Sequence, residues 1–131
     1  MPPPTRANNA IDDAPSEKLV YLNDGTGRFR PGSTYGEAAW KTRNATIADL
    51  NADGRLDLLF ANGGDYSTPG TPEPNQVFLN VGPGFRFEDA TTRFLGDTPD
   101  LARVIKARDL NADGLVDIVV GTTYQTQSRL Y

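Results

Sequence analysis

Two acidic segments of the chain have the residue types and the spacing of a loop that binds a metal ion. The segments are residues 49–57 and 109–117, and both read D-L-N-A-D-G-x-x-D. Three carboxylates and one amide within nine residues repel one another in an empty loop, and a hard divalent cation removes this repulsion. Calcium favours such an all-oxygen shell, and a glycine at the sixth position permits the sharp turn that points alternate side chains inward. We therefore expect one calcium ion (Ca2+) in each segment.

The register of the loop assigns four side chains and one main-chain carbonyl to each expected ion. The ten expected ligands are Asp49, Asn51, Asp53, Arg55 and Asp57 in the first loop, and Asp109, Asn111, Asp113, Leu115 and Asp117 in the second. Arg55 and Leu115 would contribute their backbone carbonyls. We expect structural rather than catalytic ions, because shells filled by protein oxygens leave little room for a substrate.

The residues that flank the loops decide between two scaffolds. An EF-hand needs a bidentate glutamate at loop position twelve, where this chain has Phe60 and Val120. The segments that leave the loops, residues 56–61 and 116–121, are short and apolar, which favours strands over helices. Each loop is therefore expected to join two adjacent antiparallel strands, with an EF-hand as the alternative.

A second motif repeats outside the loops. Residues 20–29 read V-Y-L-N-D-G-T-G-R-F, and residues 77–87 read V-F-L-N-V-G-P-G-F-R-F with one residue inserted. Residues 129–131 match the beginning of this motif. One period thus contains four short strands, joined by the acidic loop, a variable loop and an Asn/Gly turn. Four strands in a period of about sixty residues predict a β-propeller blade.

Together these motifs resemble the FG-GAP/VCBS repeats of integrin-like β-propellers, over residues 18–131. The resemblance implies that each calcium loop joins the two inner strands of a blade at one rim of the disc. The implied inner strands lie near residues 46–49, 56–61, 104–109 and 116–121. The implied outer pairs are residues 75–80 with 85–91, and residues 18–23 with 28–30.

The expected fold class is all-β, a β-propeller segment of about two four-stranded antiparallel blades, a slice of a larger propeller of typically about seven blades. Residues 1–16 are rich in Pro, Asn and Asp and are expected to be disordered. Residues 17–131 are expected to form the repeats. They would comprise the outer strands of one blade, a complete blade near 44–91, and three strands of the next near 103–131.

The composition argues against several classes of function. The chain has neither cysteine nor histidine, so disulfides, thiolate metal sites and the usual general base are absent. No stretch is long and apolar enough to span a membrane, and the start of the chain lacks the apolar core of a signal peptide. The net charge of −4 is more than accounted for by the six loop aspartates, and no basic stripe predicts nucleic-acid binding.

Two connections could carry further function. Residues 62–74 form a long link between strands, and such loops often bind ligands, with Asp65 and Tyr66 at the tip. A tolerated surface insertion is the favoured alternative. Trp40, with Tyr35, lies in a crossover between an outer and an inner strand, where we expect burial between blades, with a ligand platform as the alternative.

Smaller features complete the expectations. Residues 99–109 could begin with a short helical turn. Nothing in the sequence brings any two of Glu37, Glu88 and Asp89 together as an acid–base pair, so we interpret them as surface charges. The two end faces of the slice are expected to expose apolar residues such as Leu59, Val77, Ile118 and Val120, or their neighbours.

The expected function is that of a non-enzymatic, calcium-binding scaffold for adhesion or ligand binding, outside the cell or at its surface. The expected partners are calcium, an unidentified protein or glycan, and the neighbouring blades of a larger chain or of a homo-oligomer. Neither nucleic acid nor membrane insertion is expected. The alternative is part of an enzyme or carbohydrate-binding lectin whose active or sugar site lies on other blades.

Overall fold

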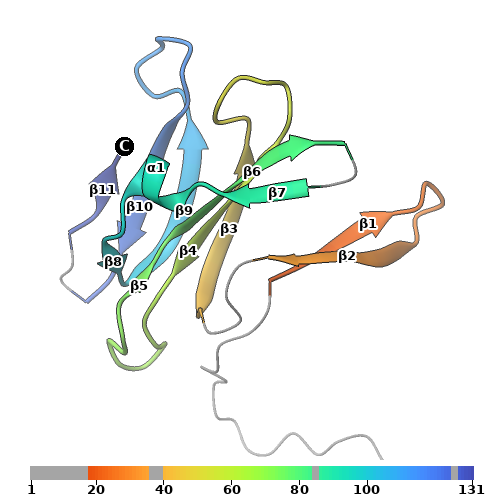
Figure 1. The fold of residues 1–131 in the computed structure, drawn as a ribbon. Coiled ribbons are helices and arrows are strands. Elements are labelled where there is room, and N and C mark those ends of the chain that lie inside the picture. Colours follow the sequence, from red (N-terminus) through yellow and green to blue (C-terminus); the bar gives the residue numbers. More distant parts are fainter. Residues whose placement is uncertain (1–17, 36–39, 84–85, 125–126) are drawn as a thin grey trace, which may run out of the picture.

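The computed structural model describes residues 18–35, 40–83, 86–124 and 127–131 (Figure 1). Within these residues the regular structure is β apart from one five-residue helix, α1 (Thr91–Leu95). The main sheets are antiparallel, which confirms the expected all-β fold class. No helix in this part of the chain has the length and apolar character needed to cross a bilayer. The expected disorder of residues 1–16 lies outside the described residues.

A four-stranded sheet forms one complete blade. Its order is β3 (Thr42–Ala48), β4 (Asp57–Asn62), β6 (Gln76–Gly82) and β7 (Arg86–Asp89). The central strands β4 and β6 are buried along most of their length, whereas β3 and β7 have several exposed positions. The apolar runs in β4 and β6 therefore correspond to strands that are covered on both faces.

A three-stranded sheet follows the complete blade in the chain. It has the order β11 (Arg129–Leu130), β10 (Asp117–Thr122) and β9 (Ala102–Arg108). Tyr131 and Ile118 also exchange two backbone hydrogen bonds of 2.8 Å, so the pairing continues to the last residue. This sheet contains the first three strands of the same repeat that builds the complete blade.

An isolated hairpin precedes both sheets and projects to one side of them (Figure 1). It consists of β1 (Lys18–Asn23) and β2 (Phe29–Tyr35), which among the described strands pair only with each other. The Asn23 side chain closes the turn by accepting hydrogen bonds from the backbone N–H groups of Gly25 and Gly27. The buried ammonium of Lys18 lies 5.3 Å from the centroid of the Phe60 ring, which ties the base of the hairpin to β4.

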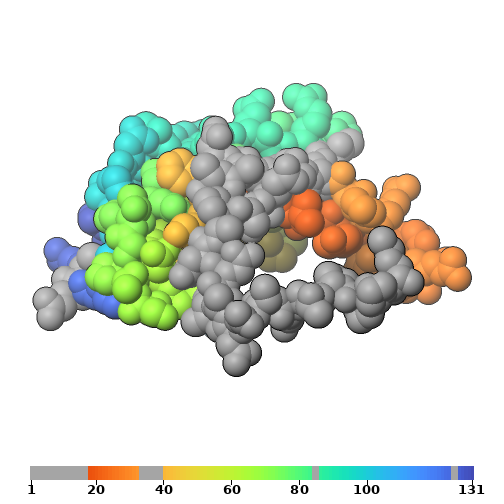
Figure 2. Space-filling model, turned by 90° about the horizontal axis from the view of Figure 1, so that it is seen from below, coloured from red at the N-terminus to blue at the C-terminus, as the bar shows by residue number. Residues whose placement is uncertain are grey.

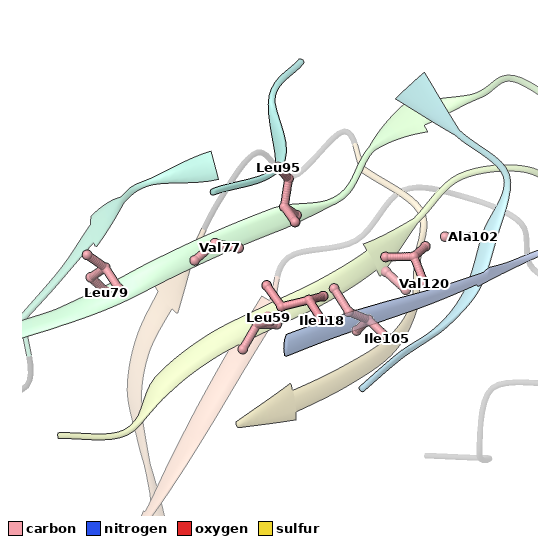
Figure 3. Packing of buried hydrophobic residues seen from close by; sticks show 9 residues of the cluster. Leu59, Val77, Leu79, Leu95, Ala102, Ile105, Ile118 and Val120 are labelled. Atoms are coloured by element: carbon pink, nitrogen blue, oxygen red, sulfur yellow. The ribbon is translucent and has the colours of Figure 1, made fainter. Parts of the chain in front are cut away.

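The core lies between the two larger sheets (Figure 3). Leu59 and Val77 of the complete blade belong to one buried cluster with Ile105, Ile118 and Val120 of the three-stranded sheet, and all five side chains are at most 3% exposed. The expectation of exposed end faces is therefore wrong for Leu59, Val77, Ile118 and Val120 themselves, whereas their neighbour Val119 is exposed.

The physical reason is the two-residue period of a strand, which sends neighbouring side chains to opposite faces. The exposed apolar residues are those on the other faces of the same sheets. Ile47 is 58% exposed on β3, Val119 is 36% exposed on β10, and Leu130 is 68% exposed on β11.

A second small sheet joins the two larger sheets at one end. It pairs β5 (Glu73–Pro74) with β8 (Pro99–Asp100), and neither strand is among those expected from the sequence. The expected helical turn at the start of 99–109 is wrong, because the helix lies earlier, at α1. There Asp89 Oδ1 accepts a 2.9 Å hydrogen bond from Thr91 N, and the buried Leu95 joins the core, which explains the position of the helix.

Candidate metal-binding loops

The two acidic loops occupy equivalent positions in the two larger sheets. Residues 49–56 join β3 to β4, and residues 109–116 join β9 to β10. Both loops extend from the same edge of the molecule, at the top of Figure 1. A strand follows each loop, so the EF-hand alternative is wrong and the expected strand–loop–strand arrangement is present.

The first loop is folded around the carboxylate of Asp49. Its Oδ1 accepts a 3.1 Å hydrogen bond from Asp53 N, and its Oδ2 accepts a 2.8 Å hydrogen bond from Gly54 N. The backbone reaches these positions through positive φ angles, 58° at Ala52 and 85° at Gly54. The turn therefore favours glycine at the sixth position, because side chains strain a left-handed backbone.

The second loop repeats this geometry. Asp109 Oδ1 accepts a 3.2 Å hydrogen bond from Asp113 N, and Asp109 Oδ2 accepts a 2.8 Å hydrogen bond from Gly114 N. The φ angles are 62° at Ala112 and 86° at Gly114. Two copies with different neighbours adopt the same backbone path, so the motif itself determines the path.

The last aspartate of each loop ties the loop to its own beginning. Asp57 is fully buried, and its Oδ2 accepts a 2.8 Å hydrogen bond from Leu50 N while its Oδ1 accepts a 2.9 Å hydrogen bond from Asn80 N. Asp117 is half-buried and accepts a 2.7 Å hydrogen bond from Leu110 N. Asp57 thus links the acidic loop to the outer β6–β7 hairpin of its blade.

The two loops differ in the charge that lies beside the fifth residue. Arg55 Nη2 forms an ion pair of 2.9 Å with Asp53 Oδ2, and Arg55 Nε donates a 2.9 Å hydrogen bond to Asn80 O. The second loop has the apolar Leu115 at this position, two residues after Asp113. Among the described residues, only the first loop therefore has a guanidinium paired with the carboxylate of its fifth residue.

Local hydrogen bonds also affect the ionisation of Asp53. The backbone N–H of Arg55 makes the largest contribution and holds the pKa of the Asp53 carboxyl below its usual value, with help from the Asn51 side chain and the Arg55 charge. The effect is a consequence of the turn, in which Arg55 N donates to Asp53 Oδ1 over 2.9 Å. The fifth loop residue thus stays ionised to lower pH than an ordinary aspartate.

The donor chemistry of the loops fits a hard cation. Among the described residues no three acidic side chains are gathered into one metal-binding group, because the loop carboxylates are turned toward backbone N–H groups. A carboxylate oxygen that accepts one hydrogen bond retains a second lone pair for a ligand bond. The expected side-chain ligands of both loops are oxygen donors, which is the shell that calcium prefers. Bound calcium would supply positive charge that neutralises the carboxylates.

The opposite edge of the molecule carries the connection between β4 and β5. Its first residues are built into the fold, since Gly64 N donates a 3.0 Å hydrogen bond to Thr71 O and Asp65 forms an ion pair with Lys41. The Lys41 ammonium holds the pKa of the Asp65 carboxyl below its usual value. The expectation of a tolerated surface insertion therefore fits only the exposed part of the connection, from Tyr66 onward.

The same connection contacts the next sheet along the chain. Arg103 of β9 donates hydrogen bonds to Gly63 O, at 2.8 Å, and to Asp65 O, and Tyr124 Oη donates a 2.9 Å hydrogen bond to Tyr66 O. Figure 2, which looks at this edge, shows the yellow-green residues of the connection against the blue residues of the C-terminal sheet. The connection therefore links the two sheets.

Two arginines at equivalent repeat positions stack on tyrosines at this edge. The Arg43 guanidinium lies 4.2 Å from the centroid of the Tyr66 ring, and the Arg103 guanidinium lies 5.8 Å from that of Tyr124. Neither arginine belongs to the motifs that mark the expected sites in the sequence. Their separation of sixty positions, the same as that of the acidic loops, is the signal that an alignment of the two repeats would have found.

Trp40 is half-buried and lines an open cavity, so it is not fully enclosed between blades. Glu88 and Asp89 are exposed at the end of β7, as expected for surface charges. The side chain of Tyr35 and the whole of Glu37 lie outside the part of the chain that the structure describes.

A family model described as an FG-GAP-like repeat matches residues 10–60 and residues 49–120. The two matches share the first acidic loop, and together they cover most of the 131 residues. The search of curated proteins gave no match.

Proposed function

This chain belongs to the FG-GAP-like repeat family, and we propose that it is a calcium-binding segment of a β-propeller. In this proposal the segment is non-catalytic and serves as an extracellular or cell-surface scaffold for adhesion or ligand binding. The observation that carries the proposal is the pair of acidic loops, which share one backbone path and one set of hydrogen bonds at equivalent places in two sheets.

Electrostatics supports a cation in each loop. Three aspartates lie within nine residues of each other in both loops, and at neutral pH their charges oppose the turn that brings them together. A divalent ion would offset this repulsion while the backbone N–H groups retain their hydrogen bonds. Calcium suits the site better than magnesium, because magnesium demands strict octahedral geometry and loses its water reluctantly.

The location and the scaffold role follow from the expected affinity and from the shape of the segment. Exposed calcium loops of modest affinity suit the high calcium concentration outside cells. The edge opposite the acidic loops presents Tyr66, 54% exposed, on a connection that both sheets hold in place. An exposed aromatic side chain on such an anchored connection suits contact with a protein or glycan partner.

Calorimetry tests the calcium proposal. Titration with calcium should reveal about two sites, and titration with magnesium should show weaker binding or none. The double substitution Asp53→Ala and Asp113→Ala should abolish the heat of calcium binding. The matched control is Asp24→Ala, because Asp24 accepts a hydrogen bond from Thr26 N in the same local pattern but lies outside the nine-residue motif. An unchanged titration in the double variant would refute the proposal.

A further inference from the structure

A cavity of about 760 Å³ lies between two successive crossovers of the repeat. Its lining includes Trp40, which precedes β3, and residues 90–93 and Asp97, which follow β7. Leu79 of β6 and Pro74 of β5 also line it. The volume falls in the range of small-molecule sites, roughly 300–1,000 Å³. The cavity shares no residue with the acidic loops.

Trp40 is the aromatic wall of this cavity and the single tryptophan of the chain. It is half-buried, and with the residues that the structure describes it forms neither a hydrogen bond nor a ring contact. Partly buried tryptophans usually pair their indole N–H and present their ring face to a neighbour. An indole that does neither within the described chain is suited to contact a ligand.

The charged groups around the cavity are predominantly acidic. Asp89 and Asp97 are held in place, because Asp89 Oδ1 accepts a 2.9 Å hydrogen bond from Thr91 N and Asp97 Oδ1 accepts a 2.8 Å hydrogen bond from Thr92 Oγ1. The third carboxylate, that of Glu88, forms no hydrogen bond or ion pair with a described residue.

One basic residue, Arg93, also lines the cavity, and its guanidinium already contacts an aromatic ring. The Arg93 guanidinium lies 5.2 Å from the centroid of the Phe94 ring. Three carboxylates and one guanidinium thus leave an excess of negative charge in the lining of the cavity, which also contains Trp40.

We propose that this cavity binds an aliphatic cation, meaning a protonated amine or a guanidinium on an apolar stem. The cation would lie over the indole face of Trp40, where cation–π attraction is strongest among the aromatic residues, and within reach of the Glu88 carboxylate. The stem would contact the apolar groups of Leu79 and Pro74. An anion would be repelled by the three carboxylates, and a neutral ligand would gain nothing from the excess charge.

Two sources could supply such a cation, a lysine or arginine side chain of a protein partner or a free alkylamine. The intrinsic fluorescence of the protein reports directly on the cavity, because Trp40 is the single tryptophan. The full chain is titrated with acetyl-Gly-Arg-Gly-amide and, separately, with n-butylammonium. Stronger binding of the peptide identifies a protein partner as the source, and stronger binding of the amine identifies a small molecule.

A saturable change in fluorescence with a cationic probe, weakened by added salt, is the expected result. The uncharged isostere acetyl-Gly-citrulline-Gly-amide should bind at least about tenfold more weakly, because it retains the shape but lacks the charge that strengthens a hydrogen bond. Equal binding of the citrulline peptide, binding of N-acetylglucosamine without binding of the cations, or no saturable change with either cation would each overturn the proposal.

Variants separate the cavity from non-specific attraction to an acidic protein. Glu88→Gln removes one charge at an exposed position and should weaken the cationic probe about tenfold, a typical loss for a charge-assisted hydrogen bond. Asp24→Asn removes one charge in the distant β1–β2 turn and should leave the affinity unchanged. An equal effect of the two substitutions would refute a specific site. The calcium titration is a separate measurement on other residues, so either proposal can fail without the other.

Discussion

At the residue scale, the two acidic loops form a natural pair for comparison, because they differ in one position that affects charge. The Arg55 guanidinium offsets part of the negative charge of the Asp53 carboxylate. Leu115 has no charge, so the Asp113 carboxylate accepts hydrogen bonds only from the Asn111 side chain and the Leu115 backbone N–H among the described donors. In the proposed calcium sites the ligand from this position is a backbone carbonyl, which any residue supplies. The side chain at this position therefore sets the local charge without changing the ligand count.

We predict that Arg55→Leu strengthens calcium binding at the first loop and that Leu115→Arg weakens binding at the second. Each change should be a factor of about two to five, the scale of an exposed ion pair. Calorimetry on single-site backgrounds, with Asp113→Ala or Asp53→Ala removing the other site, measures each loop separately. A loss of affinity in Arg55→Leu would mean that the hydrogen bond from Arg55 Nε to Asn80 O matters more than the charge.

A buried acid supplies a second prediction at this scale. Asp100 is 3% exposed, and burial raises the pKa of its carboxyl although Arg129, 3.2 Å away, opposes the rise. A pKa that is higher in the folded state than in the unfolded state means that folding favours the protonated form. The contribution of Asp100 to stability is therefore fully present below its unfolded pKa and is lost as the pH rises through its folded pKa.

The substitution Asp100→Asn should accordingly remove this pH dependence. We predict that the variant gains stability relative to the parent chain as the pH rises through the folded pKa of Asp100, because its amide keeps the contact with Asn75 without a buried charge. Urea denaturation at a series of pH values checks this. If the free energies of unfolding of the two proteins change with pH in the same way, the ion pair with Arg129 fully offsets the cost of burying the Asp100 carboxylate.

At the scale of elements, the acidic loops and the β4–β5 connection hold opposite ends of the sheets. The loops join neighbouring strands within a sheet, whereas the connection bonds to Arg103 and Tyr124 of the next sheet. The β5–β8 pair lies beside this link and depends on close backbone contact.

That close contact leaves no room for a side chain at Gly63. A Cβ atom built on Gly63 would lie 2.1 Å from Asp100 O, and the φ angle of Gly63 is +112°. We predict that Gly63→Ala destabilises the fold by more than the about 1–2 kcal/mol that a left-handed conformation alone costs. Gly25→Ala is the control, because Gly25 has a φ angle of +93° and open space around it. Equal midpoints for the two variants in denaturation would show that the β5–β8 pair shifts without cost.

Calcium should stabilise the two larger sheets if the loops bind it only when folded. We predict a gain of roughly 2.7 kcal/mol per site at a free calcium concentration of about one hundred times Kd. Chelation should therefore lower the melting temperature, and the Asp53→Ala and Asp113→Ala double variant should not respond to the chelator. If chelator does not change the melting temperature of the parent chain, metal binding at the loops is not coupled to the stability of the fold.

At the scale of the whole molecule, the β1–β2 hairpin is a largely exposed part of the described chain. Tyr21 is 56% exposed and Phe29 is 64% exposed, whereas Phe78, which matches Tyr21 in the repeat, is 5% exposed where β6 pairs with β4. The hairpin has the sequence of an outer pair but pairs with no inner strand among the described residues. Exposed strand edges and apolar faces of this kind favour association with another chain.

We predict that the isolated chain does not persist as a monomer in calcium. It should aggregate or assemble head to tail, with a contact of the type that closes a ring when the rotation permits. Light scattering after size-exclusion chromatography measures the state. Tyr21→Lys should shift the distribution toward smaller species, and Thr26→Lys in the exposed turn is the control for added charge. A monodisperse monomer of the parent chain would show that the exposed hairpin face needs no partner.

The sequence by itself determined the local features of this protein. The acidic loops, the strands on either side of them and the Asn/Gly turn of the hairpin follow from short-range chemistry. Positive φ angles favour glycine, side-chain oxygens bond to the N–H groups of nearby residues, and β-branched runs extend. Repetition strengthened these predictions, because the same residues occur twice at one spacing.

Only the tertiary structure decided which faces meet and which groups cross between the sheets. Leu59 and Ile47 are both apolar strand residues, yet one is fully buried and the other is 58% exposed, because the second sheet covers one face of the blade. The link from Arg103 to Gly63 O and the pairing of β5 with β8 join residues that are far apart in the chain. Contacts of this kind depend on the orientation of one sheet against the other, which the periodicity of a single strand does not contain.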